Sequence, residues 1–287
     1  MTTTGKNRIM IFGPKTDGTY VVEFRTAEGE SLAISIPKTE TAVIRHFHER
    51  MPYGLFASGA TTIDRMRAFK AERLARIDAG EAIVPLIVRP DRLVLHLVPL
   101  ASFGLGEPID LAQAHASQTS LVPIAASTGF SPRINFEGFA NFSVGRDGLC
   151  RSYTQVFRNG IIEAVKVGIL DDRTLSALAF DHWIFGVLPE YLKALRELNV
   201  PAPITMMLSL QGVRGAFLVT HANWHINPPP PFDRAVLELP EVIIEQYGTL
   251  EDYQRTVRPA FDALWNAAGY FGSKHFDAQG RWIAQPK

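Results

Sequence analysis

The sequence predicts an α+β fold in which a mainly antiparallel sheet is flanked by helices. The clearest signal is the segment 134–170, where three apolar stretches are separated by Asp147-Gly148 and Asn159-Gly160. Both dipeptides tolerate positive φ at low cost, as tight hairpin loops require. Segments with apolar residues at helical spacing lie on either side of this region. We therefore expect a β-meander over 134–170 that helices cover on both faces.

Two-residue loops at these dipeptides would fix how the three strands pair. Across the first turn, Phe142 should face Tyr153. Across the second turn, Tyr153 should face Lys166 and Phe157 should face Ile162. Each face of the meander then holds apolar side chains, with Phe142, Tyr153, Phe157 and Ile162 on one and Phe139, Val156 and Val165 on the other.

Residues 1–60 are predicted to form a separate small unit that combines a β-sheet with one helix. Turn dipeptides divide its first part into three strands, expected at 9–12, 19–25 and 30–36. Pro37 ends this pattern, and 39–50 has the apolar spacing of a short helix. The small-residue stretch ASGATT at 57–62 then marks a boundary between units.

Two further units are expected after this boundary. Residues 61–103 should hold a basic helix that starts at Thr61 or Thr62 and ends before Gly80, then a hairpin of strands at 83–88 and 93–98. Residues 104–120 are expected to be a connection. The third unit, 121–287, should contain the meander, a helical stretch over 171–198 interrupted at Pro189, strands at 204–210, 216–220, 236–239 and 242–247, and a last helix that Thr249 and Asp252 cap.

The charge balance gives no global attraction to nucleic acid or anionic membranes, because 29 basic and 29 acidic residues cancel. Cys150 is the single cysteine, so an internal disulfide is excluded, and we expect it to be buried and inert in a reducing compartment. No window approaches the roughly 20 apolar residues of a membrane span. The start MTTTGKNRIMIFG does not resemble a signal peptide. These observations predict a cytoplasmic protein without a membrane contact.

Clustered arginines are the strongest candidates for contacts with nucleic acid or a partner. Arg65, Arg67, Arg73 and Arg76 lie on the expected basic helix. A solvated helix face with internal ion pairs is the alternative, and we favour it. A second set of candidates lies on the meander: Arg151, Tyr153 and Arg158. For these three, pairing between neighbouring strands is the favoured interpretation.

The sequence contains no complete catalytic motif: it lacks a Gly-x-Ser-x-Gly elbow, a Gly-x-Gly-x-x-Gly loop after a strand, a Walker loop and a Cys-x-x-Cys pair. His221 and His225 have the four-residue spacing of helical metal ligands. They are weak candidates, because they follow a predicted strand and precede the proline run 228–231. His96 lies within an apolar run and is expected to be a core histidine with one hydrogen-bond partner. No cofactor is predicted.

Several stretches between Arg65 and Tyr270 resemble a group of bacterial proteins that carry an N-terminal Schlafen-type AlbA domain. These stretches are RMRAFKAERLARIDAGE, RLVLHLVPLASF, RINFEGF with CRSYTQVFRNGIIEAV, LPEYLKALRELNV with MMLSLQGVRG, and RPAFDALWNAAGY. They occur in the order found downstream of the AlbA domain. In that family the AlbA domain itself is described as DNA-binding or as a divergent ATPase.

The residues that the family places in its AlbA site do not precede Arg65 in this sequence. Residues 1–60 instead resemble short uncharacterised bacterial proteins. The resemblance therefore implies an accessory region, and DNA or ATP binding is carried onto no residue of this chain. We expect a non-catalytic binding or regulatory protein that contacts a protein partner or acts beside DNA. The alternative is a hydrolase or nuclease whose site gathers His221, His225, His96 and Asp181.

Overall fold

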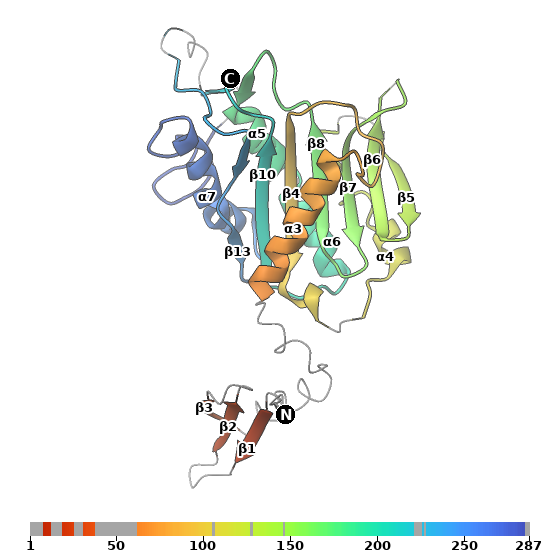
Figure 1. The fold of residues 1–287 in the computed structure, drawn as a ribbon, viewed down its shortest axis with the longest axis vertical. Coiled ribbons are helices and arrows are strands. Elements are labelled where there is room, and N and C mark those ends of the chain that lie inside the picture. Colours follow the sequence, from red (N-terminus) through yellow and green to blue (C-terminus); the bar gives the residue numbers. More distant parts are fainter. Residues whose placement is uncertain are drawn as a thin grey trace, which may run out of the picture. The chain divides into compact units, whose positions relative to one another are not determined.

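The computed structural model divides into two compact units, residues 1–67 and 68–287, which are described separately. The residues that the structure describes are 8–12, 19–25, 31–37, 62–104, 107–126, 129–145, 147–220, 226 and 228–284. Figure 1 shows the ribbon of both units with the element labels used below. The histidines His221 and His225 and the helix expected at 39–50 lie outside the described residues.

The N-terminal unit contains a three-stranded antiparallel sheet in the order β1-β2-β3. Its strands are β1 (Arg8–Phe12), β2 (Thr19–Arg25) and β3 (Ser31–Pro37). Each bound lies within one residue of the expectation. The apolar alternation of these short segments is therefore a sufficient signal for strands when turn residues separate them.

The second unit is organised around an eight-stranded sheet in the order β12-β10-β4-β8-β7-β6-β5, with β13 also paired to β10. All of its pairings are antiparallel, which confirms the predicted α+β class. Its strands are β4 (Arg92–Pro99), β5 (Ser131–Asn135), β6 (Gly138–Val144), β7 (Cys150–Phe157), β8 (Ile162–Val167), β10 (Ile204–Gln211), β12 (Val236–Glu238) and β13 (Val242–Ile244).

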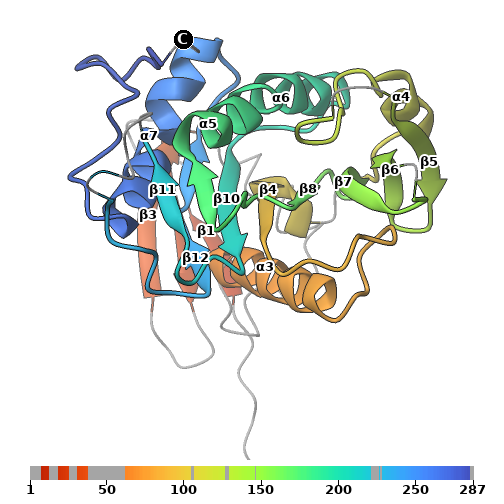
Figure 2. The ribbon, with the colours of Figure 1, turned by 90° about the horizontal axis from the view of Figure 1, so that it is seen from above.

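Helices cover both faces of this sheet (Figure 2). One face is crossed by α3 (Thr62–Asp78), and the opposite face is covered by α4 (Leu111–Ala116), α5 (Ala177–Phe185) and α6 (Leu188–Glu197). The last helix, α7 (Leu250–Ala267), lies beside β13 (Figure 1). A short 3₁₀ helix, η1 (Leu100–Phe103), follows β4. The helices that cover both faces explain why the strands between them are apolar on both sides.

Two predicted helix starts are confirmed. Pro189 lies in the first turn of α6, where its missing N–H costs no hydrogen bond. At α7 the side chain of Thr249 accepts from the backbone N–H of Asp252, and the carboxylate of Asp252 accepts from the N–H of Thr249. This reciprocal capping box satisfies two N–H groups that the helix itself leaves without a partner.

The second hairpin of the meander pairs one residue away from the prediction. Tyr153 faces Val165 and Val156 faces Ile162, whereas Tyr153 and Phe142 pair across the first hairpin as expected. The loop contains three residues, because Phe157 N–H donates to Ile161 O and Gly160 N–H donates to Phe157 O.

Gly160 explains this difference. Its φ of 84° places it in the left-handed region at the third position of the loop, as in hairpins that close with a bulge. A shift of one residue moves every side chain of a strand to the other face of the sheet. Ile162 therefore packs in the core on the α5 and α6 side, and Val165 packs under α3.

The hairpin expected over 83–98 does not form. Residues 93–98 lie in β4 as predicted, but β4 pairs with β8 on one side and β10 on the other. Between 83 and 88, only Leu86 makes an isolated bridge, to Cys150. Pro85 in this segment has no N–H for a sheet ladder. Since β4 is a central strand, the units expected at 61–103 and 121–287 share one sheet.

Three smaller expectations also change. The connection 104–120 contains α4, and the expected helical stretch from 171 begins with the short strand β9 (Thr174–Ser176). The strand expected at 216–220 is β11 (Phe217–Val219), which pairs in parallel with β9 and not with the large sheet. Among the described residues, no helix is both long enough and apolar enough to cross a membrane.

Candidate functional site

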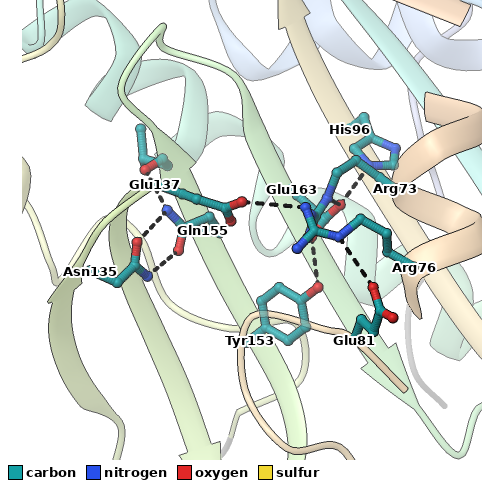
Figure 3. A network of polar contacts seen from close by, with 10 residues as sticks. Arg73, Arg76, Glu81, His96, Asn135, Glu137, Tyr153, Gln155 and Glu163 are labelled. Carbon is teal, nitrogen blue, oxygen red and sulfur yellow. Dashed lines mark hydrogen bonds and ion pairs between the residues drawn. The ribbon is translucent and has the colours of Figure 1, made fainter. Parts of the chain in front are cut away.

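Four polar side chains meet in the interior between α3 and the sheet (Figure 3). Glu163 of β8 lies at the centre, and His96 faces it from the neighbouring strand β4. Tyr153 reaches it from β7, on the other side of β8, and Arg73 reaches it from α3. We call these four residues the Glu163 network. Neighbouring strands and one helix thus bring together residues that are distant in the sequence.

The carboxylate of Glu163 accepts a hydrogen bond from each of the other three residues. Arg73 donates through Nε to Oε2 and through Nη2 to Oε1, both at 2.9 Å. The hydroxyl of Tyr153 donates to Oε1 at 2.6 Å, and Nε2 of His96 lies 3.0 Å from Oε2. Because an ionised carboxylate can only accept, Nε2 of His96 carries the proton. The two-pronged contact fixes the plane of the guanidinium as well as its position.

Burial and pairing act in opposite directions on these groups. Burial alone would raise the pKa of Glu163, but hydrogen bonds from Arg73 and His96 outweigh it and lower the pKa from 4.5 to about 2. Burial lowers the pKa of Arg73, but its contacts with Glu163 prevail and raise it above its usual value. Burial and the negative charge of Glu163 raise the pKa of Tyr153. The network is therefore an ionised Glu–Arg pair to which Tyr153 and His96 also donate.

Aromatic rings separate the Glu163 network from solvent. The guanidinium of Arg73 lies over the ring of Phe157 at 5.2 Å, and Phe69 packs edge-on against His96 at 5.7 Å. Glu163 and His96 are both 0% exposed. The described residues provide no hydrogen-bond partner for two buried nitrogens, Nη1 of Arg73 and Nδ1 of His96. In this arrangement the network holds α3 on the sheet and is closed off from solvent.

Other cations of α3 also bind acids of the same unit. Lys70 Nζ lies 2.5 Å from Glu238 of β12. Arg76 lies 3.4 Å from Glu137, in the turn between β5 and β6, and 3.8 Å from Glu81 (Figure 3). Lys70 and Arg73 are buried and Arg76 is half-buried. The favoured interpretation of α3 was a solvated helix face with internal ion pairs. The ion pairs are present, but Lys70 and Arg73 are buried and not solvated.

The remaining predicted contact residues lie at the start of α3 and on the meander. Arg65 and Arg67 lie near the start of α3, and neither is without an interaction. Arg151 is exposed and lies 3.3 Å from Asp147 in its own hairpin. Arg158 donates to the carbonyl of Phe136 at 2.8 Å. Arg151 and Arg158 thus make contacts between neighbouring strands or within the hairpin, as Tyr153 does in the buried Glu163 network.

Of the proposed members of a dispersed hydrolase site, the two that the structure describes, His96 and Asp181, do not come together. His96 faces α3, whereas Asp181 belongs to α5 on the opposite face of the sheet. Oδ2 of Asp181 accepts from Nδ1 of His275 at 2.5 Å and from Nε1 of Trp282 at 2.9 Å. His275 was missed from the sequence because it is far from Asp181 along the chain. This contact fastens the segment after α7 to α5.

The described residues contain no group of three or more His, Cys, Asp or Glu side chains that could hold a metal ion. Cys150 is buried as predicted, and burial raises the pKa of its thiol to about 11, which disfavours the reactive thiolate.

Two clefts follow the outer edge formed by β12 and β13. A cleft of about 500 Å³ lies between β12 and the C-terminal half of α7. A second one of about 270 Å³ lies between the end of β13 and the N-terminal half of α7. Together we call them the edge groove. A separate cavity of about 450 Å³ lies between η1, α4 and the end of α6.

Comparison of this chain with family models, curated proteins and solved structures finds no match. The resemblance to proteins with an AlbA domain therefore stays a prediction, and the function has to be argued from the geometry described above.

Proposed function

We propose that this chain is a non-catalytic binding protein whose second unit contacts a protein partner. One observation carries the proposal: the basic side chains of α3 are joined to carboxylates of their own unit. Lys70, Arg73 and Arg76 bind Glu238, Glu163 and Glu137, which belong to three different parts of the sheet. A helix whose cations are engaged in this way offers few free charges to a phosphate backbone.

The overall charge also favours a protein partner over nucleic acid. Acidic and basic residues are equal in number, so that no long-range field draws a polyanion to the molecule. A protein partner does not need such a field, because main-chain groups and apolar side chains can supply recognition. The edge groove offers both kinds of group. We place this function in the cytoplasm because a single cysteine fits a reducing compartment, and the proposal requires no cofactor.

The test is a selection of phage-displayed random peptides on the full chain, followed by titration of synthetic peptides. We expect sequence-related peptides to bind at micromolar concentration. In parallel, a fluorescent DNA duplex is titrated at about 50 and 200 mM salt. Tight duplex binding that falls steeply with salt, and that Arg67→Ala weakens, would favour nucleic acid and overturn the proposal.

A second arm addresses the enzyme alternative. The full chain is incubated with bis-p-nitrophenyl phosphate and with p-nitrophenyl acetate, which report on phosphodiester and ester cleavage. We expect no turnover above the rate without protein. Turnover that His275→Asn or Asp181→Asn abolishes, in variants that remain folded, would instead assign a hydrolase to this pair and contradict the proposal.

A further inference from the structure

The outer edge of β12 presents main-chain groups that point away from the sheet. Leu239 N–H donates to Leu208 O at 2.9 Å, in register with the pairing of Leu237 with Leu210. Bonded and non-bonded pairs alternate along an antiparallel ladder. Leu237 and Leu239 therefore direct their N–H and C=O groups to β10, and Val236 and Glu238 direct theirs outward. Among the described residues, none bonds to the outward N–H groups.

The edge groove gives an added strand room beside these groups. Where β12 faces α7, the helix contributes Ala263 and Ala267, whose small side chains are one turn apart and leave space. Val236 is 39% exposed on β12, and Ile243 is 48% exposed on β13. Exposed β-branched residues on a strand next to a helix are suited to pack against the side chains of another strand.

The opposite edge of the sheet is protected by its sequence. The edge strand β5 contains Pro132, which has no N–H to donate, and Arg133 beside it. Proline and charged residues are common means by which natural edge strands avoid pairing with other chains. β12 itself contains no proline and its outward N–H groups at Val236 and Glu238 remain available, whereas Pro240 after it supplies none. The two edges therefore differ in their capacity to pair.

The charges of the edge groove favour a basic segment. Its lining includes the carboxylates Asp233, Glu238, Glu245 and Asp252. Three of them have a cation within 4 Å. Asp233 lies 3.9 Å from Arg234, Glu238 lies 2.5 Å from Lys70, and Asp252 lies 2.6 Å from Arg255. Within the described part of the chain, Glu245 has no ion-pair partner. A Lys or Arg of the ligand would complement it.

We propose that the β12 edge binds an extended segment of a partner protein. The segment adds to the sheet as a strand beside β12, lies in the edge groove, and places a Lys or Arg near Glu245. About eight residues at ~3.3 Å each are enough to reach from Val236 to Glu245. Main-chain hydrogen bonds supply affinity, and side-chain pockets supply specificity. This inference rests on the proposed function and adds the site and the class of partner.

The test uses the peptides that the selection above provides. Val236→Pro removes one outward N–H without removing a bond to β10, and we expect it to weaken peptide binding at least about tenfold, as the loss of a buried hydrogen bond does. Ile134→Pro on the protected β5 edge is the matched control and should leave binding unchanged. Circular dichroism and urea unfolding show whether both variants are folded.

A measurement on the ligand keeps the test valid if Val236→Pro does not fold. Two versions of the selected peptide carry N-methyl groups, one on odd and one on even residues. Only one of them should lose binding to the unaltered chain, because alternate N–H groups of an added strand face β12. Glu245→Gln should weaken binding about threefold to tenfold at low salt and less at high salt.

The outcomes separate the two proposals. If no peptide binds the chain, the proposed function fails. If peptides bind but neither Val236→Pro nor N-methylation in either register affects them, the protein-binding function stands and the β12 edge is not its site.

Discussion

The two faces of the large sheet are built differently, although the same strands form both. On β4, residues Leu93, Leu95 and Leu97 pack in the core that α5, α6 and α7 cover. The residues between them, Val94 and His96, face α3. The α5 and α6 face is mainly apolar, although it also holds buried polar groups such as Thr154, whose hydroxyl bonds to Tyr191 of α6, and Asp181 of α5. The α3 face surrounds a fully buried ionised network with a smaller apolar cluster.

The difference shows how each face contributes to the fold. Apolar burial is non-directional and stabilises the sheet in proportion to area. The Glu163 network is directional, because the two-pronged contact of Arg73 allows one position and rotation of α3. The desolvation of both charges offsets most of their attraction, so the pair adds little net stability. We infer that the α5 and α6 face stabilises the unit and that the Glu163 network determines where α3 lies.

The largest expected effect comes from breaking the Glu163 network on one side. Glu163→Ala leaves the guanidinium of Arg73 buried without its carboxylate, and we expect a loss of about 3–5 kcal/mol in the free energy of unfolding. Urea unfolding followed by circular dichroism measures this loss. A cost below about 1 kcal/mol would show that solvent reaches Arg73, and the contrast between the faces would disappear.

The apolar face should respond to the loss of volume and not to the loss of charge. Leu195 of α6 is 0% exposed, and Leu195→Ala should cost about 3 kcal/mol through lost transfer energy and the cavity left behind. Leu195→Met keeps the volume and should cost less than about 1.5 kcal/mol. Equal costs for the two variants in urea unfolding would mean that this core is not tightly packed.

Acid should weaken the α3 face selectively. The folded pKa of Glu163, about 2, lies below the 4.5 of the free side chain, so its contribution is present above pH 4.5 and is lost as pH falls toward 2. The lost contribution is on the order of 3 kcal/mol. Glu163→Gln should lack this part of the pH dependence. Unfolding free energies of both proteins between pH 6 and pH 2.5 give the comparison, and parallel profiles would contradict it.

Replacing both charges should cost much less than removing one. To remove both desolvated charges without leaving the donors of Tyr153 and His96 buried and unpaired, Tyr153→Phe and His96→Leu are combined with Arg73→Met and Glu163→Leu. We expect the stability of this variant within about 1 kcal/mol of the original chain. Hydrogen exchange of α3 amides then tests the role in specificity. Faster exchange in α3 at unchanged global stability supports that role, and unchanged exchange would remove it.

The smallest effect is expected at the half-exposed end of α3. Arg76 pairs with Glu137 and Glu81 at 3.4 and 3.8 Å, close to solvent. Arg76→Ala should therefore cost less than about 1 kcal/mol in urea unfolding, and less still at high salt. A larger, salt-independent loss would place Arg76 with Arg73 in the buried part of the network.

Local patterns were sufficient for most elements and insufficient for how they pair. Pro189 and the Thr249–Asp252 capping box located two helix starts, because both signals act within one turn. The dipeptide Asn159-Gly160 located a hairpin but not its loop length, since two-residue and three-residue loops accept the same residues. Pairing of β4 depends on β8 and β10, so its hydrophobic run alone suggested the wrong partner.

The Glu163 network could have been partly anticipated. Glu163 lies between Ile162 and Ala164 in an otherwise apolar strand, and a carboxylate in such a place requires a buried cation or donor. His96 carries the same signal in β4. The sequence does not show which cation pairs with Glu163, because α3 contains several basic residues. Only the rotation of α3 on the sheet selects Arg73.

The sequence by itself determined the class of the fold, the positions of most strands and helices, and the burial of Cys150 and His96. These properties follow from the chemistry of neighbouring residues. Only the tertiary structure decided that Arg73, His96 and Tyr153 converge on Glu163, that Ile162 and Val165 exchange faces, and that β12 keeps an open edge beside α7. Each of these depends on strand order and register, which are set by packing between segments far apart along the chain.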